Sequence, residues 1–320
     1  MPTPVFVLQD GAVDELMSVV LVTRMPEVEL LGVGIANADC LGEPTVRTTR
    51  KLLHWLGRDD VPVGLSAARG VNAFPWEYRP YSMMADLLPI LNRGTPPEAA
   101  EAGDAEELLI AAVEKCVAAG TKLTVLALCP LTPLVHAWTR EPSLKQGIAE
   151  IVWMGGALKP TSDPGDAPYG NVDTGLAPGA NPNAEWNAFW DPFAVDDVFG
   201  SGVPVTVFPL NVTNQVTMNR DFILGLAPGS VSNPIYDLAG QLYAMVAFQA
   251  GYSFWDTVAT AYLAEPELFT TTQRSLVAIT RGPEQGTILD GDCATLVTVA
   301  ETVQTAAFYT YLMTAWAGPV

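Results

Sequence analysis

The sequence predicts an α/β protein with an open, mostly parallel sheet and helices on both faces. Short apolar runs rich in β-branched residues recur along the 320 residues, and amphipathic segments with helical spacing separate most of them. No break in composition suggests a domain boundary, so we expect a single domain over residues 1–320. Hydrophobic residues make up 49% of the chain, enough to fill a large core.

The first element is an apolar run, Val5 to Leu8, which Gln9, Asp10 and Gly11 end with a turn signal. Apolar residues at helical spacing follow, so the unit is strand, turn, helix. The expected strands lie at 5–9, 28–36, 61–66, 122–128, 150–156, 203–210 and 275–280. The expected later helices lie at 43–57, 105–119, 131–139 and 191–199.

One long segment, residues 155–183, is rich in Gly, Pro, Asp and Asn. Loops of this length in compact domains are usually functional, so we expect a lid-like loop; a solvated insertion without a role is the alternative.

The charge of the chain excludes several partners. Thirty-five acidic and 16 basic residues give a net charge of -19, which would repel nucleic acids and anionic lipid surfaces. The N-terminus shows no signal-peptide pattern and no apolar run reaches about 18 residues, so we expect a cytoplasmic protein. Four scattered cysteines argue against a disulfide framework and a thiolate zinc site. With His54 and His136 in apparently helical segments, a histidine mechanism is not expected.

Three acids, Asp10, Asp14 and Glu15, crowd the joint between the first strand and its helix. They could serve the turn and the helix N-terminus, where negative charge is favourable. They could instead form a site for a hard cation built from oxygen ligands. This stretch alone leaves both interpretations open.

Ligands bind beyond the carboxyl ends of strands in open parallel sheets. Further candidates lie at or just after the ends of other predicted strands, whereas Glu185 and Asn187 precede a predicted helix, and Trp255 and Asp256 begin another. Each of these residues alone has an ordinary structural explanation, such as a cap, a surface pair or core packing. Together they suit a polyhydroxyl ligand held beside a cation. The residues are Asn37, Asp39, Leu128, Met154, Glu185, Asn187, Trp255 and Asp256.

Several motifs resemble those of the nucleoside hydrolases, and in particular their purine-preferring, inosine-adenosine-guanosine class. "QDGAVDE" resembles the N-terminal acidic motif D-x-D-x-x-x-D-D, and "NADC" resembles D-A-D-C. "FPWEYR" is similar to F-P-x-x-W-R, while "VWMGGA", "GNV" and "AEWNAFWDP" match almost letter for letter. "FWDTVATAYL" resembles the C-terminal W-D helix start. These motifs span nearly the whole chain.

The resemblance implies an open, Rossmann-like α/β fold, a bound Ca²⁺ and a nucleoside substrate, and a homodimer is the assembly it suggests. It assigns metal ligation to Asp10, Asp14, Glu15, Asp256 and the carbonyl of Leu128. Asp14, Asp39 and Asp256 would also contact substrate. Met154, Asn171, Glu185 and Asn187 would hold the ribose, with Asn181 as a competitor for the place of Asn171.

The implied reaction is hydrolysis of the N-glycosidic bond of purine ribonucleosides, as in purine salvage. Asp10 would remove a proton from water while carboxylates stabilise an oxocarbenium-like state. The purine class is thought to hold the base between aromatic rings rather than to use a histidine. Trp255 is the candidate for one ring, and either Tyr78 or Trp76 for the other.

Three residues depart from the family pattern. Leu8 and Asn37 each stand where an acid is expected, and Glu15 is longer by one C–C bond than the aspartate it replaces. We expect Ca²⁺ binding and hydrolysis to survive. The alternative is an impaired homologue that binds a nucleoside or ribose without cleaving it. A phosphatase with an aspartate nucleophile is disfavoured, because no Lys or Arg lies at the mouth of the first strand.

Overall fold

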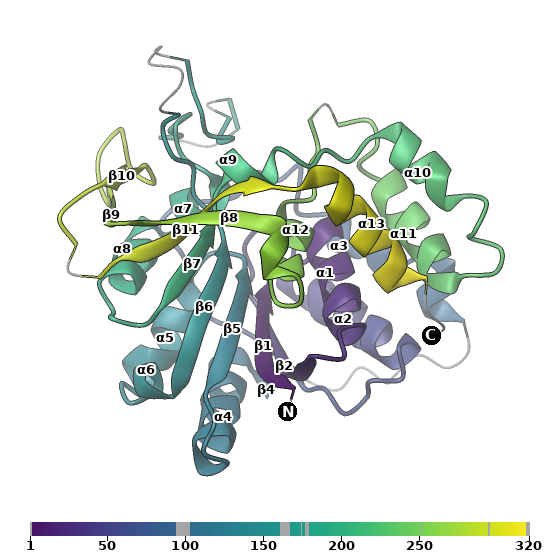
Figure 1. Ribbon diagram of the computed structural model, residues 1–320, viewed down its shortest axis with the longest axis horizontal. Coiled ribbons are helices and arrows are strands. Elements are labelled where there is room, and N and C mark those ends of the chain that lie inside the picture. Colours follow the sequence, from purple (N-terminus) through teal and green to yellow (C-terminus); the bar gives the residue numbers. More distant parts are fainter. Residues whose placement is uncertain are drawn as a thin grey trace.

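The computed structural model describes residues 2–93, 103–160, 167–173, 175–176, 179–249, 251–293 and 295–317. Over these residues the centre is a nine-stranded sheet in the order β4-β3-β2-β1-β5-β6-β7-β11-β8 (Figure 1). Its described neighbours pair in parallel, apart from β8, which runs antiparallel to β11. The predicted fold class is confirmed.

The strand positions match the predicted apolar runs for most of the chain. The main sheet contains β1 (Thr3–Gln9), β2 (Val28–Ile35), β3 (Val63–Leu65), β4 (Gly103–Asp104), β5 (Leu123–Leu128), β6 (Ile148–Met154), β7 (Val205–Phe208), β8 (Phe269–Arg274) and β11 (Val297–Val303). The run at 275–280 forms β9 (Leu276–Ala278), which pairs with β10 (Ile288–Asp290) in a separate two-stranded sheet rather than in the main one.

The predicted helices are found at their expected places as α2, α4, α5 and α8. The described helices are α1 (Val13–Thr23), α2 (Gly42–Trp55), α3 (Tyr81–Asp86), α4 (Ala105–Ala118), α5 (Thr132–Arg140), α6 (Leu144–Gly147), α7 (Trp186–Trp190), α8 (Pro192–Phe199), α9 (Leu210–Thr213), α10 (Arg220–Leu226), α11 (Pro234–Ala244), α12 (Trp255–Ala261) and α13 (Thr305–Trp316). Among the described residues, no helix is both long enough and apolar enough to cross a membrane.

The sheet separates two hydrophobic cores. Along β1, Val5 and Val7 join the core shared with α1, α2, α11, α12 and α13, while Phe6 and Leu8 join the core shared with α4, α5 and α8. This two-residue alternation is the period of a strand whose faces are both covered. The helices accordingly lie on both sides of the strands in Figure 1.

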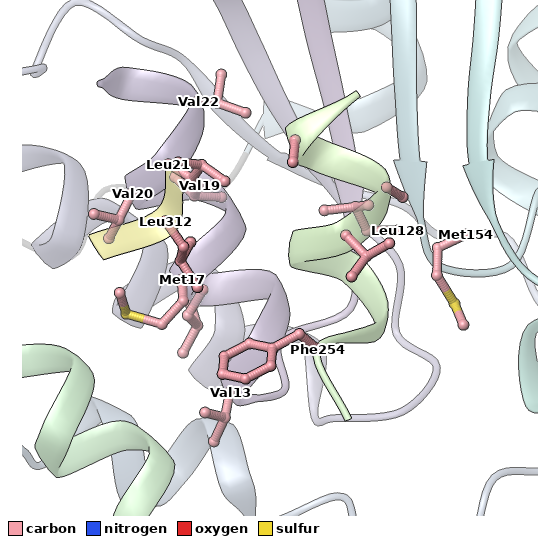
Figure 2. Close-up of a cluster of buried hydrophobic side chains, with 14 of the residues drawn as sticks. Val13, Met17, Val19, Val20, Leu21, Val22, Leu128, Met154, Phe254 and Leu312 are labelled. Atoms are coloured by element: carbon pink, nitrogen blue, oxygen red, sulfur yellow. The ribbon is translucent and has the colours of Figure 1, made fainter. Parts of the chain in front are cut away.

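Helix α1 is buried along most of its length because α12 and α13 cover it. Figure 2 shows Val13 and Met17 of α1 gathered with Phe254 and with Leu312 of α13. This packing fixes the start of α12 beside the end of β1, which is where the acidic residues of the two segments meet.

Candidate functional site

A cavity of about 300 Å³ opens at the carboxyl ends of β1, β5 and β6. It brings together most of the residues predicted from sequence. Its lining consists of Asp10, Ala12, Glu15, Asp39, Phe74, Tyr78, Tyr81, Leu128, Met154, Asn171, Glu185, Trp186, Asn187, Val246, Gln249, Gly251, Tyr252, Trp255 and Asp256. Figure 2 shows the positions of Leu128 and Met154, which end neighbouring strands.

Asp10 is held in place by the turn that ends β1. Gly11 follows it with φ of +96°, and a Cβ there would lie 2.2 Å from Oγ1 of Thr45, so only glycine fits. The N–H groups of Asp39 and Cys40 donate to Oδ2 and to the carbonyl oxygen of Asp10, each over 3.1 Å. The loop after β2 therefore fixes both the backbone and the carboxylate of Asp10.

The carboxyl groups of the cavity wall repel one another. Burial raises the pKa of Asp10 to about 6, although hydrogen bonds to Glu15 and Asp39 oppose the rise. The pKa values of Glu15, Asp39 and Asp256 are raised well above their ordinary range, first by burial and then by the neighbouring acids. The Asp10 and Glu15 carboxyl groups also interact with each other, which lowers the pKa of Asp10 and raises that of Glu15.

Asp14 differs from the expectation, because it lies outside the cavity lining. Its Oδ2 accepts the N–H groups of Asp256 (2.6 Å) and Thr257 (2.9 Å), which belong to the first turn of α12. Its Oδ1 accepts the hydroxyl groups of Tyr243 (2.6 Å) and Thr257. Asp14 thus satisfies the N-terminus of α12 and supports Asp256 from beneath the cavity.

Glu185 and Asn187 lie at the start of α7 and reach the end of β6. Glu185 accepts N–H groups from Gly156 (2.8 Å), Asn187 (2.8 Å) and Ala188 (3.1 Å). Burial nevertheless raises its pKa to about 7. The side chain of Asn187 donates to the carbonyl oxygen of Met154 over 3.0 Å. Three of the four residues predicted to hold the ribose, Met154, Glu185 and Asn187, are therefore one connected unit.

Aromatic rings form much of the remaining wall. Tyr78 lines the cavity with its ring edge-on to Trp186, at 6.2 Å between centroids, and Trp255 lies edge-on to Tyr252 at 4.7 Å. Trp76 does not line the cavity: its side chain is 75% exposed, and the Arg79 guanidinium lies 5.5 Å from its ring centroid. Of the two candidates for the second ring, Tyr78 lines the cavity and Trp76 does not.

Asn171 lines the cavity, and its Oδ1 accepts the N–H of Trp186 over 3.1 Å. The competing Asn181 points elsewhere, with its amide donating to Gln285 and Thr287. Both belong to the segment predicted to form a lid. Residues 161–166, 174 and 177–178 of that segment lie outside the described residues, and the lid stays a prediction.

Arg79 is a residue of the site that the sequence reasoning missed. Its Nη1 donates to the carbonyl oxygen of Ala38 (2.6 Å) and its Nη2 to Oδ1 of Asn37 (2.8 Å). Its charge also lowers the pKa values of Asp10 and Asp39, although burial dominates both. Arg79 therefore clamps the loop that carries Asp39. The signal was present in "FPWEYR", which also contains the cavity residue Phe74.

No histidine takes part in the cavity. His54 is exposed and pairs with Asp59, and His136 is exposed on α5. Neither lines the cavity, as expected from the sequence. The four cysteines are free.

The donor chemistry of the cavity suits a hard cation. Asp10, Glu15, Asp256 and Leu128 all line it, and the buried Oδ1 atoms of Asp39 and Asp256 have no hydrogen-bond partner. The donors are not preassembled, however: over the described residues, no group of three or more His, Cys, Asp or Glu is placed to hold a metal.

Both the sequence and the fold of the chain are similar to those of known proteins. The profile of the family described as "Inosine-uridine preferring nucleoside hydrolase" matches residues 5–310. Uridine nucleosidase 1 of Arabidopsis thaliana is 28% identical over 82% of this chain and 74% of its own length. The pyrimidine-specific ribonucleoside hydrolase RihA of Salmonella enteritidis is 26% identical, covering 88% of this chain and 86% of that protein.

A solved structure agrees with this assignment. The inosine-uridine preferring nucleoside hydrolase from Bacillus anthracis superimposes with a TM-score of 0.88 at 32% identity, covering 98% of this chain and 99% of that one. The profile match, the sheet order and the shared fold lead to one conclusion: the chain belongs to the inosine-uridine preferring nucleoside hydrolase family.

Proposed function

We propose that this nucleoside hydrolase cleaves purine ribonucleosides to free base and ribose, with Ca²⁺ bound and Asp10 activating the attacking water. The observation that carries the proposal is the composition of the cavity wall, where buried carboxyl groups and aromatic rings occur together without a histidine or a basic side chain. The relatives named above include pyrimidine-specific enzymes, so the base preference rests on the cavity alone.

The ribose would lie among the polar groups at the ends of β1 and β6. Asn171, Glu185 and Asn187 supply amide and carboxyl groups that can exchange hydrogen bonds with sugar hydroxyls. Because Glu185 and Asn187 are fixed to Gly156 and Met154, these groups are ordered before a substrate arrives.

Asp10, Glu15, Asp256 and the carbonyl of Leu128 would hold the cation. When bound, Ca²⁺ supplies positive charge that allows these acids to ionise together and makes nearby water more acidic. Asp14 is not assigned as a ligand, because its two oxygens already accept four hydrogen bonds from Tyr243, Asp256 and Thr257.

In this proposal Asp10 acts as the general base. The Asp10 carboxylate takes a proton from water as the water oxygen bonds to the anomeric carbon. In the same step the C–N bond to the nucleobase breaks, and its electron pair leaves with the nucleobase. The surrounding carboxylates favour the positive charge that develops on the sugar. The N–H of Asp39 keeps the Asp10 carboxylate oriented for this step.

Trp255 and Tyr78 are the rings that would contact the base. A purine presents more area to an aromatic face than a pyrimidine does, so stacking favours the larger base.

The test is release of base and ribose from inosine, guanosine, adenosine and uridine, each assayed with Ca²⁺ and with a strong chelator. Cleavage of purine ribosides that depends on Ca²⁺, with little from uridine, is the expected result. Preferred cleavage of uridine would overturn the base preference. No cleavage by folded, Ca²⁺-loaded protein would instead favour a homologue that binds nucleosides without cleaving them.

A further inference from the structure

We infer that Asn214 is a positioning residue that fixes the plane of the Trp255 indole and so sets how well the enzyme discriminates between bases. The inference rests on the proposed contact between Trp255 and the base. Its starting observation is a hydrogen bond of 2.8 Å from Nε1 of Trp255 to Oδ1 of Asn214. Nε1 is the single polar atom of an indole, and it can only donate.

Asn214 sits on a backbone that is tied to the main sheet. It follows α9, and its N–H donates to the carbonyl oxygen of Leu210 over 3.0 Å. The next residue, Gln215, bonds to the end of β11 through both ends of its amide: Nε2 donates to Glu301 (3.0 Å), and Oε1 accepts from Val303 (3.3 Å). The backbone that carries the acceptor of the indole N–H is therefore held in place.

The backbone that carries Trp255 is fixed to the same segment. Thr217 and Ser253 form an antiparallel bridge. On its two sides the N–H of Phe254 donates to Val216 and the N–H of Met218 donates to Tyr252, each over 2.9 Å. The position of Trp255 along the chain is thus set by these bonds, and what remains free is rotation of the indole about its side-chain bonds.

Two contacts remove that rotation. The Tyr252 ring lies 4.7 Å from the Trp255 ring at an interplanar angle of 63°, and Asn214 holds the polar edge. An ordered ring stacks on a ligand without first losing rotational freedom, so pre-orientation strengthens binding. A misaligned ring would lose contact over the stacked face of the ligand, and that face is larger for a purine than for a pyrimidine.

The experiment is a double-mutant cycle between Asn214→Leu and Trp255→Phe, read out as KM for inosine and for uridine. Asn214→Leu keeps the side-chain size but removes the acceptor, and it should raise KM for inosine about three- to fivefold, with a smaller change for uridine and little change in kcat. Trp255→Phe removes the donor but keeps a ring. Adding Asn214→Leu to Trp255→Phe should therefore change KM by less than about twofold.

Two further variants separate orientation from general damage. Asn214→Asp keeps an acceptor and should keep KM near that of the wild type. Asn219→Leu removes a comparable side-chain hydrogen bond, to Phe222, from the same connection without touching Trp255, and should leave KM unchanged. An Asn214→Leu effect that persists in full in the Trp255→Phe background, or that Asn219→Leu reproduces, would overturn the inference.

A readout independent of activity keeps this test apart from that of the proposed function. The indole N–H signal of Trp255, identified by its loss in Trp255→Phe, should exchange with solvent faster in Asn214→Leu than in the wild type. Unchanged exchange together with unchanged KM would show that Asn214 does not hold the ring. If no nucleoside is cleaved, the proposed function fails, while faster exchange would still establish the Asn214–Trp255 contact.

Discussion

The backbone N–H of Asp39 donates a hydrogen bond of 3.1 Å to Oδ2 of Asp10. The two residues follow neighbouring parallel strands, β1 and β2, so the bond joins the two loops at the carboxyl edge of the sheet. Both loops therefore determine the orientation of Asp10, the proposed general base.

Asp10→Asn should abolish most of the activity while leaving the fold intact. The amide keeps the size of the side chain and an acceptor for the Asp39 N–H, but it cannot take a proton. Loss of a positioned general base usually costs about 10²- to 10⁴-fold in rate. The check is kcat for inosine beside a urea unfolding curve. Full activity in a folded variant would assign the proton transfer to another group.

Arg79→Gln should lower kcat without unfolding the protein, because it releases the loop that carries Asp39. Hydrogen bonds to charged groups contribute about 1.5–3 kcal/mol, so we expect a loss of about ten- to hundredfold. Arg79→Lys should recover only part of it, since an ammonium group cannot reproduce the fork that spans Ala38 and Asn37. Equal kcat values for the wild type, Arg79→Gln and Arg79→Lys would show that the hydrogen bonds of Arg79 to Ala38 and Asn37 are dispensable.

Glu15→Asp should tighten Ca²⁺ binding. The shorter side chain, by about 1.5 Å, moves the carboxyl group away from that of Asp10, whose proximity raises the pKa of Glu15, and leaves more room for a cation between them. Titration of the metal-free proteins by calorimetry compares the affinities. Unchanged affinity would show that side-chain length does not limit binding, and no saturable binding by the wild type at millimolar Ca²⁺ would refute the proposed cofactor.

The stability of the metal-free protein should fall between pH 4.5 and 7, in part through Glu185. Burial raises its pKa to about 7 from the ordinary 4.5. The proton is therefore bound more tightly in the folded state, and the stabilisation that it gives is complete below pH 4.5 and lost as the pH rises through 7. The shift corresponds to about 3 kcal/mol.

Urea unfolding in chelator, at a series of pH values, measures this effect. Glu185→Gln has no proton to lose, so its unfolding free energy should fall less steeply over the same interval. Parallel curves for the two proteins would mean that Glu185 titrates normally in the folded chain.

Leu8→Asp should destabilise the protein more than Leu8→Ala does. Leu8 is fully buried, and its Cδ2 lies only 2.7 Å from where a Cβ on Gly34 would stand. Leu→Ala changes in cores cost about 2–5 kcal/mol, and an unpaired carboxylate adds the cost of its desolvation. Unfolding free energies measure both. If Leu8→Asp proved the milder change, a partner for the family's acid must persist near this position.

The sequence predicted six of the parallel strands, namely β1, β2, β3, β5, β6 and β7, because strands covered on both faces are continuous apolar runs. It did not reveal β8, whose central residues Thr270, Thr271, Thr272 and Gln273 are polar and exposed. Nor did it reveal β11, in which polar residues interrupt the apolar ones. Edge strands and their neighbours carry a weaker hydrophobic signal, and their pairing partners lie far away in the chain.

The site was predictable where a residue lies at or shortly after the end of a strand, as for Asp10, Asp39 and Met154. It was less predictable where tertiary contacts decide whether a side chain faces the cavity. Asp14 and Glu15 are adjacent in sequence, yet α12 captures the first while the second faces the cavity. Trp76 and Tyr78 are two residues apart, and only Tyr78 enters the lining. No local pattern distinguishes the members of these pairs.

The two described ends of the sheet, β4 and β8, have a consequence for how copies of the chain meet. β4 contains only two residues, and β8 presents threonines and a glutamine. Short or polar edge strands are poor templates for the addition of a further strand. Over the described residues, neither border of the main sheet favours continuation of the sheet into a neighbouring molecule, so we expect any contact between folded copies to use helices and loops instead.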